Sequence, residues 1–305
     1  MSRPCVGLYG YFGHGNLGDE ALRLSWSRTL QGRFCLSTCS PPRLPFRQGP
    51  WLFCGGLLQD RTSLRSLLFY MAAIGTAARR APVALASVGV DLRRRVSREA
   101  VRAALARVDY LSVRDEFSAT ELSRLGFNPR VYPDPVLSWR PPTRRPGGAV
   151  LVNLVSELPA WLRTQAVVQA QRLGAGLKAP VKGLAMSPQD LPALAGLDPL
   201  RPATPAQALE LLAAAPLIIA ARLHALELAL VAGTPFVALP YAHKVNAFLH
   251  LVERGLPAPV PRVPAGAEDL LAGDWQRGLL RARERLGEEA REGIRDVENW
   301  LAQVA

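Results

Sequence analysis

The sequence has 305 residues, 49% of them apolar, with 25 glycines and 26 prolines. This composition excludes a disordered tail, a collagen-like fibre and a small disulfide-stapled module, and the length suits two domains of about 150 residues. The 37 basic and 25 acidic residues give a formal net charge of +12, which favours anionic partners. Nearly all the basic residues are arginines, a skew typical of codon bias, so the charge alone is weak evidence for nucleic-acid binding.

The cysteines and the apolar segments indicate a reduced, cytoplasmic protein. The four cysteines have neither C-x-x-C spacing nor a histidine at zinc-ligand spacing, so we expect no metal. The first residues lead into a strand-like segment without the pattern of a signal peptide. The most apolar uncharged stretch, Ser66–Ala78, is shorter than the roughly 20 residues that span a bilayer.

Short apolar runs alternate with helix-like segments along the first 140 residues. The runs predict strands at Val6–Tyr9, Phe34–Ser37, Trp51–Cys54, Val83–Val88, Tyr110–Val113 and Arg130–Tyr132. The segments between them predict helices near Asp19–Leu30, Ser63–Ala78, Ser97–Val108 and Glu116–Leu125. A Pro-, Arg- and Gly-rich stretch at 140–148 is the best candidate linker.

The same alternation resumes after this stretch. Strands are expected at Ala149–Leu154, Val181–Ala185, Pro216–Ala220 and Pro235–Leu239. Helices are expected up to Gly174 and at Pro205–Ala213, Leu223–Val231 and Val245–Arg254. The last 25 residues predict one amphipathic helix, because apolar residues recur there at steps of three and four.

This pattern predicts an α/β protein of two doubly wound, Rossmann-like domains that face each other across a cleft, followed by a C-terminal helix. The expected parts are an N-terminal acceptor-side domain (1–140), a C-terminal donor-side domain (149–275) and the helix (276–305). Ligands of such folds bind at the carboxyl ends of the strands, so residues that follow strands are the candidates for function.

The first strand is followed by a glycine loop, Gly13-His-Gly-Asn-Leu-Gly18. A dinucleotide site needs an acidic residue about 20 positions further on, and positions 21–59 contain no Asp or Glu. Two interpretations of the loop remain. It is a structural turn capped by Asp19, or it presents Asn16, Asp19 and backbone groups, including the backbone of Gly18, to a neutral hydroxyl-rich ligand. We favour the last interpretation.

Cations stand where three helices are expected to begin. Arg222 and His224 follow one predicted strand, Lys244 follows the next, and Arg114 follows a strand in the first half. Positive charge is unfavourable at a helix N-terminus unless an anion completes the site. We therefore expect these side chains to converge on one small, highly charged anion.

Each of these residues also has a purely structural interpretation. Arg114 could pair with the neighbouring Asp115 or Glu116, and Arg222 with a nearby carboxylate. His224 could be a core histidine that is bonded to Glu227 one turn on. The recurrence of cations at successive strand ends favours the functional interpretation.

In chain order, several short motifs resemble the polysaccharide pyruvyl transferase family, and nearly the whole chain takes part. The closest similarity is to the bacterial branch that pyruvylates a cell-wall polysaccharide to which surface-layer proteins anchor. The motifs are Gly10-Tyr-Phe-Gly-His-Gly-Asn-Leu-Gly-Asp-Glu-Ala-Leu22, Gly55-Gly-Leu-Leu-Gln-Asp60, Ser112-Val-Arg-Asp-Glu116, Tyr132-Pro-Asp-Pro135, Arg222-Leu-His224, Ala232-Gly-Thr-Pro-Phe-Val237 and Lys244-Val245.

The resemblance implies a glycosyltransferase-B-like architecture and phosphoenolpyruvate as the donor substrate, with no resident cofactor. It places Arg114, Arg222, Leu223 (through its backbone), His224 and Lys244 around the donor. It further implies a lipid-linked or polymeric amino-sugar acceptor, N-acetylmannosamine in particular, and a 4,6-linked pyruvate ketal as the product.

The residue types suit this chemistry. Phosphoenolpyruvate carries a carboxylate and a phosphate on three carbons, which several cations would hold. His224 is the candidate general acid toward its methylene carbon, because its ordinary pKa is near 6.5. Asp19 is a candidate base or acceptor ligand, and Asp134 a candidate acceptor-positioning residue.

Two other functions remain open. A nucleotide-sugar glycosyltransferase of the same fold would use the cations to hold a diphosphate. A non-catalytic protein that binds nucleic acid is disfavoured, because the arginines are dispersed in the sequence and no recognition motif is present. We expect no nucleic-acid partner, but we expect peripheral contact with the anionic inner face of the plasma membrane.

Overall fold

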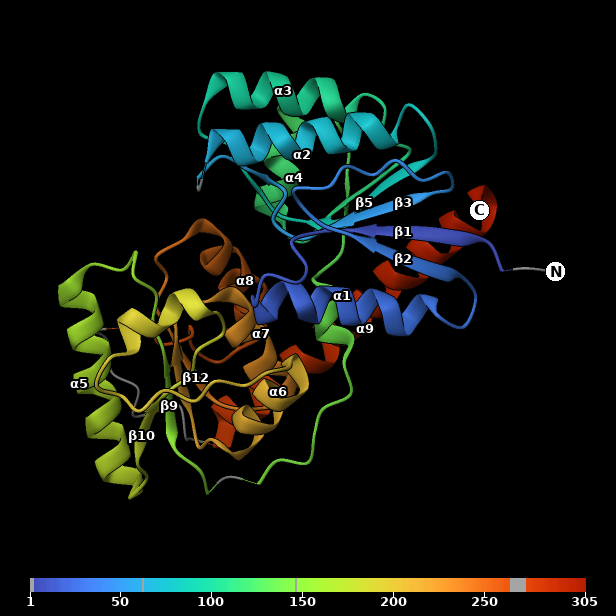
Figure 1. Ribbon diagram of the computed structural model, residues 1–305. Coiled ribbons are helices and arrows are strands. Elements are labelled where there is room, and N and C mark those ends of the chain that lie inside the picture. The colour runs from blue at the N-terminus through green and yellow to red at the C-terminus, as the bar shows by residue number, and fades with distance from the viewer. Residues whose placement is uncertain (1–2, 62, 146, 264–272) are drawn as a thin grey trace. The chain divides into compact units, whose positions relative to one another are not determined.

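The computed structural model describes residues 3–61, 63–145, 147–263 and 273–305 (Figure 1). The chain divides into two compact units. Unit 1 comprises the described residues of Met1–His14, Ala21–Pro135 and Glu288–Ala305, and unit 2 those of Gly15–Glu20 and Val136–Gly287. The glycine loop therefore contributes residues 15–20 to the unit that is formed mainly by the second half of the chain.

Unit 1 is built on a parallel six-stranded sheet with the order β2-β1-β3-β5-β7-β8. Its strands are β1 (Cys5–Tyr9), β2 (Cys35–Cys39), β3 (Trp51–Cys54), β5 (Val83–Val88), β7 (Tyr110–Val113) and β8 (Arg130–Val131). All six residues of β5 are buried, as expected of a central strand covered on both faces. Two short strands, β4 (Leu58–Gln59) and β6 (Val90–Asp91), pair separately.

The helices of unit 1 cover both faces of this sheet. They are α1 (Leu17–Leu30), whose first turn counts with unit 2, α2 (Leu64–Ala77), α3 (Arg95–Leu105) and α4 (Glu116–Ser123). The connections from β3 to β5 and from β5 to β7 run in the same direction along the sheet, so right-handed crossovers place α2 and α3 on one face (Figure 1). The core beneath them includes Tyr9, Phe53, Leu67, Ile74 and Leu85.

Unit 2 repeats the plan with a parallel four-stranded sheet of order β10-β9-β11-β12. Its strands are β9 (Val150–Asn153), β10 (Val181–Gly183), β11 (Ile218–Ala220) and β12 (Phe236–Ala238). Its helices are α5 (Ala160–Leu177), α6 (Pro205–Ala214), α7 (Leu223–Ala232) and α8 (His243–Glu253), with 3-10 turns η1 (Pro135–Ser138) and η2 (Pro188–Leu194). Nine of the ten residues of α7 are buried, so this helix lies in the core of the unit.

Several boundaries differ from the sequence-based expectation. The second strand is shifted from Phe34–Ser37 to Cys35–Cys39, and the helix expected at Ser97–Val108 is α3 at Arg95–Leu105. The C-terminal helix α9 (Gly273–Val304) has 32 residues, more than the 25 expected. Its first part belongs to unit 2, whereas its residues from Glu288 onward belong to unit 1.

The Pro- and Arg-rich stretch after the first half is attached to unit 2. Arg144 donates to the hydroxyl of Thr234 at 2.8 Å and to the carbonyl of Pro216 at 3.1 Å. The backbone N–H groups of Gly147 and Gly148 donate to the carbonyl of Ala214. Within the described residues, no helix combines the length and the apolar character that crossing a bilayer requires.

Candidate active site

Arg222 and His224 stand at the carboxyl edge of the unit 2 sheet, where β11 leads into α7. Arg222 is the N-cap residue of the helix and has an extended backbone, and Leu223 is its first helical residue and is buried. The short connection follows from the sequence, because the buried strand Ile218–Ala220 is separated from the apolar helix by only two residues. His224 is thus held in the first turn of a buried helix.

A buried carboxylate fixes the guanidinium of Arg222. Nε of Arg222 donates to both oxygens of Asp190, at 2.7 and 2.8 Å, and the second nitrogen Nη2 contacts the same carboxylate. Asp190 is fully buried, and its Oδ2 also accepts from the backbone N–H of Met186 at 3.0 Å. Burial lowers the pKa of Arg222, but the pair with Asp190 outweighs it and raises the pKa above its usual value. One side of the guanidinium is therefore occupied, and its orientation is set.

Asn153, the last residue of β9, connects this pair to the sheet. Its Oδ1 accepts from the backbone N–H of Arg222 at 2.9 Å, and its Nδ2 donates to the carbonyl of Leu184 and to Asp190. Sequence reasoning does not identify Asp190 or Asn153, because each looks like an ordinary residue in a turn or at the end of a strand. The pairing of Arg222 with a nearby carboxylate, which was the structural alternative, is present, yet the partner lies 32 positions away.

A second buried carboxylate lies beside His224. Nε2 of His224 is 3.6 Å from Oε2 of Glu227, whose side chain is only 2% exposed. This distance is an ionic contact when the imidazole is protonated, but it is longer than a hydrogen bond. The alternative interpretation of His224 named Glu227 as a bonded partner, and the two groups do lie side by side.

The glycine loop lies against the same helix start. Gly15 has a φ of 73°, a left-handed conformation that favours glycine. Gly18 packs directly on the imidazole of His224, because a Cβ atom at Gly18 would lie 2.1 Å from Nδ1. The N–H of Leu17 donates to the carbonyl of Met186 at 2.9 Å, which anchors the loop beside the segment that leads to Asp190.

Asp19 is the titratable group of this loop. Asn16 donates to its carboxylate through Nδ2 and accepts from the N–H of Gly18 through Oδ1. Burial raises the pKa of Asp19 to about 6, even though the positive charges of His224, Lys244 and Arg222 act to lower it. Asp19 therefore changes its charge close to neutral pH and within the field of all three cations.

Lys244 enters from the next strand–helix junction. It is the second residue of α8, and the N-cap residue Ala242 makes no capping bond through its side chain. Unit 2 thus brings together Asn16, Gly18, Asp19, Arg222, Leu223, His224 and Lys244 at the carboxyl ends of its strands. The arrangement can hold an anion near Arg222 and Lys244 and can exchange protons through His224 and Asp19.

The other two predicted site residues belong to unit 1. Arg114 follows β7, and its Nε lies 3.4 Å from Oδ2 of Asp115, so the alternative pairing of Arg114 with its neighbour is present. Its guanidinium also lies against Gly89, where a Cβ atom would be 2.2 Å from Nη2. Asp134 lies beyond β8 and is 2% exposed. Membership of both residues in the donor and acceptor site stays a prediction.

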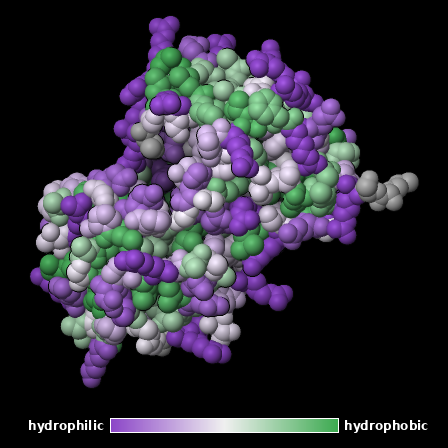
Figure 2. Space-filling model, in the orientation of Figure 1, coloured by the Kyte–Doolittle hydropathy of each residue, from purple (hydrophilic) through white to green (hydrophobic). Residues whose placement is uncertain are grey.

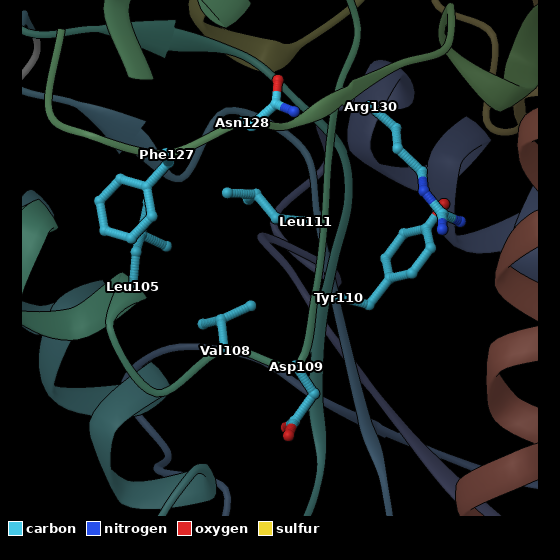
Figure 3. A pocket seen from close by; sticks show the side chains of 8 residues that line it. All are labelled: Leu105, Val108, Asp109, Tyr110, Leu111, Phe127, Asn128 and Arg130. Atoms are coloured by element: carbon cyan, nitrogen blue, oxygen red, sulfur yellow. The ribbon is translucent and has the colours of Figure 1, made fainter. Parts of the chain in front are cut away.

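A pocket of about 280 Å³ in unit 1 lies away from these strand ends. As Figure 3 shows, its lining comes from the amino ends of β7 and β8 and the segments before them: Leu105, Val108, Asp109, Tyr110, Leu111, Phe127, Asn128 and Arg130. Asp109 is already engaged, because its Oδ2 accepts from the N–H of Val83 at 2.8 Å. The pocket lies at the amino ends of the strands, whereas Arg114 follows the carboxyl end of β7, so we assign the pocket no role in the chemistry.

Comparisons with known proteins identify a family and a fold for this chain. A family model described as polysaccharide pyruvyl transferase matches residues 16–243, which include every predicted site residue except Lys244. A search of curated proteins finds no match.

Among solved structures, the chain is similar to CalG4, the calicheamicin glycosyltransferase, with a TM-score of 0.52, 15% identity and full coverage of both chains. It is also similar to a putative UDP-N-acetylglucosamine 2-epimerase from Listeria monocytogenes, with a TM-score of 0.56, 9% identity and coverage of 96% of this chain and 91% of that chain. A third similar structure is the spinosyn forosaminyltransferase SpnP, with a TM-score of 0.52, 12% identity and coverage of 99% and 100%. At these identities the likeness concerns the fold alone, which is of the glycosyltransferase-B type, as expected.

Proposed function

Because the chain belongs to the polysaccharide pyruvyl transferase family, we propose that it transfers a pyruvyl group from phosphoenolpyruvate to a sugar of a cell-wall polysaccharide precursor. The product would be a 4,6-pyruvate ketal, on N-acetylmannosamine in particular, and phosphate would be released. The observation that supports this proposal most strongly is the gathering of Arg222, His224 and Lys244 around the Asp19 carboxylate in unit 2.

The donor would bind through its two charged groups. Arg222, oriented by Asp190, offers its remaining N–H groups to one of them, and Lys244 offsets the charge of the other. The N-terminus of α7, including the backbone N–H of Leu223, adds a favourable dipole for an anion. Arg114 is the predicted contribution of unit 1. This set of groups would hold the phosphate and carboxylate of phosphoenolpyruvate without a resident cofactor.

The reaction would begin with proton transfer from His224 to the methylene carbon, which leaves a cationic centre at the middle carbon. A sugar hydroxyl attacks this carbon and loses its proton to a base. The bond from this carbon to the phosphate oxygen then breaks, and the phosphate leaves with the bonding electrons. A second hydroxyl adds to the same carbon and passes its proton to the departing phosphate, which closes the ketal. Asp19, with a pKa of about 6, can accept a hydroxyl proton at neutral pH. Asn16, Gly18 and Asp134 would position the sugar, as predicted from the sequence.

The direct experiment is incubation of the protein with phosphoenolpyruvate and a panel of lipid-linked disaccharides, with phosphate release as the readout. We expect turnover of the His224→Ala variant to be roughly two to four orders of magnitude slower, which is the usual contribution of a general acid. Binding of phosphoenolpyruvate should persist in this variant, because the cations remain.

Two results would count against the proposal. Near-normal turnover of His224→Ala would refute its role as the acid. Thermal stabilisation of the wild-type protein by a uridine diphosphate sugar, but not by phosphoenolpyruvate, would point instead to the alternative function, a nucleotide-sugar-dependent glycosyltransferase.

A further inference from the structure

The exposed residues of α2, of α3 and of the turn that follows α2 are rich in arginine. The two helices pack side by side on the same face of the sheet (Figure 1). We call this surface the α2–α3 face and define it by six exposed residues: Arg65, Leu68, Arg79, Arg95, Val96 and Arg102. Arg65 and Leu68 are three residues apart on α2, Arg95 and Arg102 are seven residues apart on α3, and Arg79 lies in the turn that follows α2.

The charge on this face is nearly all of one sign. The segments 63–81 and 92–108 contain nine arginines but only one acidic residue, Glu99. Asp91 and Glu121 lie near Arg93 and Arg98, at 3.6 and 3.8 Å. Glu99 is exposed on α3, four residues after Arg95 and three before Arg102, so it is the acidic group within the face. On α9, in contrast, arginines form ion pairs with acidic residues of the same helix, for example Arg291 and Arg295 with Glu288.

Two of these arginines stand where they do not favour the helix. Arg65 is the second residue of α2, and Arg95 is the first residue of α3. Positive charge in a first helical turn opposes the helix dipole. No acidic residue of α2 compensates Arg65, whereas Arg95 has Glu99 four residues further along α3. An anionic partner would favour both positions.

Apolar side chains are interspersed among the charges. Leu68 is 43% exposed and Val96 is 53% exposed, and both are among the few large apolar residues at the surface of the described chain. Figure 2 shows hydrophobic and strongly hydrophilic residues next to one another over the region that α2 and α3 occupy in Figure 1. None of the six residues is aromatic, and the exposed ring of Phe46 lies beside Arg80, with its centroid 5.3 Å from the guanidinium.

We propose that the α2–α3 face binds an anionic lipid surface. The guanidinium groups would contact the headgroups, while Leu68, Val96 and the aliphatic stems of the arginines reach the interfacial region. The combination of dispersed arginines and exposed aliphatic side chains favours this partner over nucleic acid, which the charges alone would also attract. The inference does not depend on the reaction that the protein catalyses.

The test is cosedimentation of the full chain with two kinds of vesicle at physiological salt. One kind consists of phosphatidylcholine alone, and the other also contains roughly one third phosphatidylserine. We expect binding only to the anionic vesicles. The triple variant Arg65→Gln, Arg95→Gln and Arg102→Gln should bind them on the order of 100-fold more weakly, since each arginine near such a surface contributes about a fivefold factor. Folding should be intact, because two of the three charges stand in first helical turns.

A charge-matched control separates this face from the net charge of the protein. The control removes Arg172, Arg201 and Arg281, which are exposed residues of unit 2. The control variant should lose little affinity for anionic vesicles. The double variant Leu68→Ser and Val96→Ser should weaken the part of the vesicle binding that persists at high salt. The proposal would be overturned if both triple variants lost the same vesicle affinity. It would also be overturned if the protein bound no vesicles but bound duplex DNA through the arginines of this face.

Discussion

At the scale of single residues, the orientation of Arg222 depends on a carboxylate far away in the sequence. Asp190 occupies one side of the guanidinium and leaves the other side for a ligand. We expect Asp190→Asn to raise the KM for the proposed donor, phosphoenolpyruvate, on the order of tenfold, the cost of losing a charge-assisted hydrogen bond, while the KM for the acceptor stays the same. Steady-state kinetics with each substrate varied in turn would measure this.

A double-mutant cycle shows whether Asp190 acts through Arg222. If it does, Asp190→Asn combined with Arg222→Lys should bind the donor no worse than Arg222→Lys alone. The matched control is Glu253→Gln, which breaks the 3.0 Å ion pair with Arg262 in the same unit and should leave the donor KM unchanged. Additive losses in the cycle would show that Asp190 affects the site only through general stability.

The titration of Asp19 predicts two opposite responses to pH. As a base, Asp19 must be ionised, so turnover should fall about tenfold per pH unit below about 6, and Asp19→Asn should abolish this acidic limb. For folding the sign is reversed, because the pKa of about 6 lies above the ordinary value of an aspartate, near 4. The stabilising effect of the bound proton is complete below pH 4 or so and is lost as the pH rises through about 6.

Urea unfolding at pH 5 and pH 7 would test the folding response, with activity profiles measured in parallel. From pH 5 to pH 7 the wild-type protein should lose more unfolding free energy than Asp19→Asn. An acidic limb of turnover that is identical in both proteins would exclude Asp19 as the base.

At the scale of elements, the start of α3 is determined by a contact with another segment. Asp60 is buried, and its carboxylate accepts from the backbone N–H groups of Arg93 and Arg94 at 2.9–3.2 Å. The local sequence around Ser97 predicts a later start, because a serine is a common N-cap residue. Asp60 caps the helix from outside and lets it begin at Arg95.

This contact gives a testable effect on stability. Asp60→Ala should lower the free energy of unfolding by about 1 kcal/mol, since it removes the acceptor of two partly buried N–H groups. Asp60→Asn should lose less, because an amide oxygen can still accept. Denaturant unfolding followed by circular dichroism would measure both, and equal losses in the two variants would argue against the capping role.

Helix ends that depend on local signals were predictable from the sequence. Gly233 ends α7 in the left-handed conformation with a φ of 70°, two residues beyond the expected end at Val231. The expected helix at Pro205–Ala213 is α6 at Pro205–Ala214, with a proline in the first turn and Thr204 as the N-cap residue. These signals act within one turn of the backbone, so no distant contact is needed to read them.

At the scale of the whole molecule, alternating apolar runs and amphipathic segments were enough to predict two parallel-sheet units, whereas the glycosyltransferase-B type of fold was implied by the family resemblance. The period of the apolar positions determines whether a segment is a strand or a helix, and short connections allow few topologies. The motifs at the strand ends also pointed to the family that the comparison then showed. Residue order alone carried this information.

The assignment of particular groups to one site needed the tertiary structure. Residues 15–20 lie in unit 2 although unit 1 precedes and follows them in the chain, and Asp190 pairs with Arg222 across 32 positions. Such contacts depend on how segments pack, and a buried carboxylate has the same local sequence signal as an exposed one. The sequence by itself determined the elements, the fold class and the family. Only the three-dimensional packing decided which charges are neutralised inside the protein and which remain for a ligand.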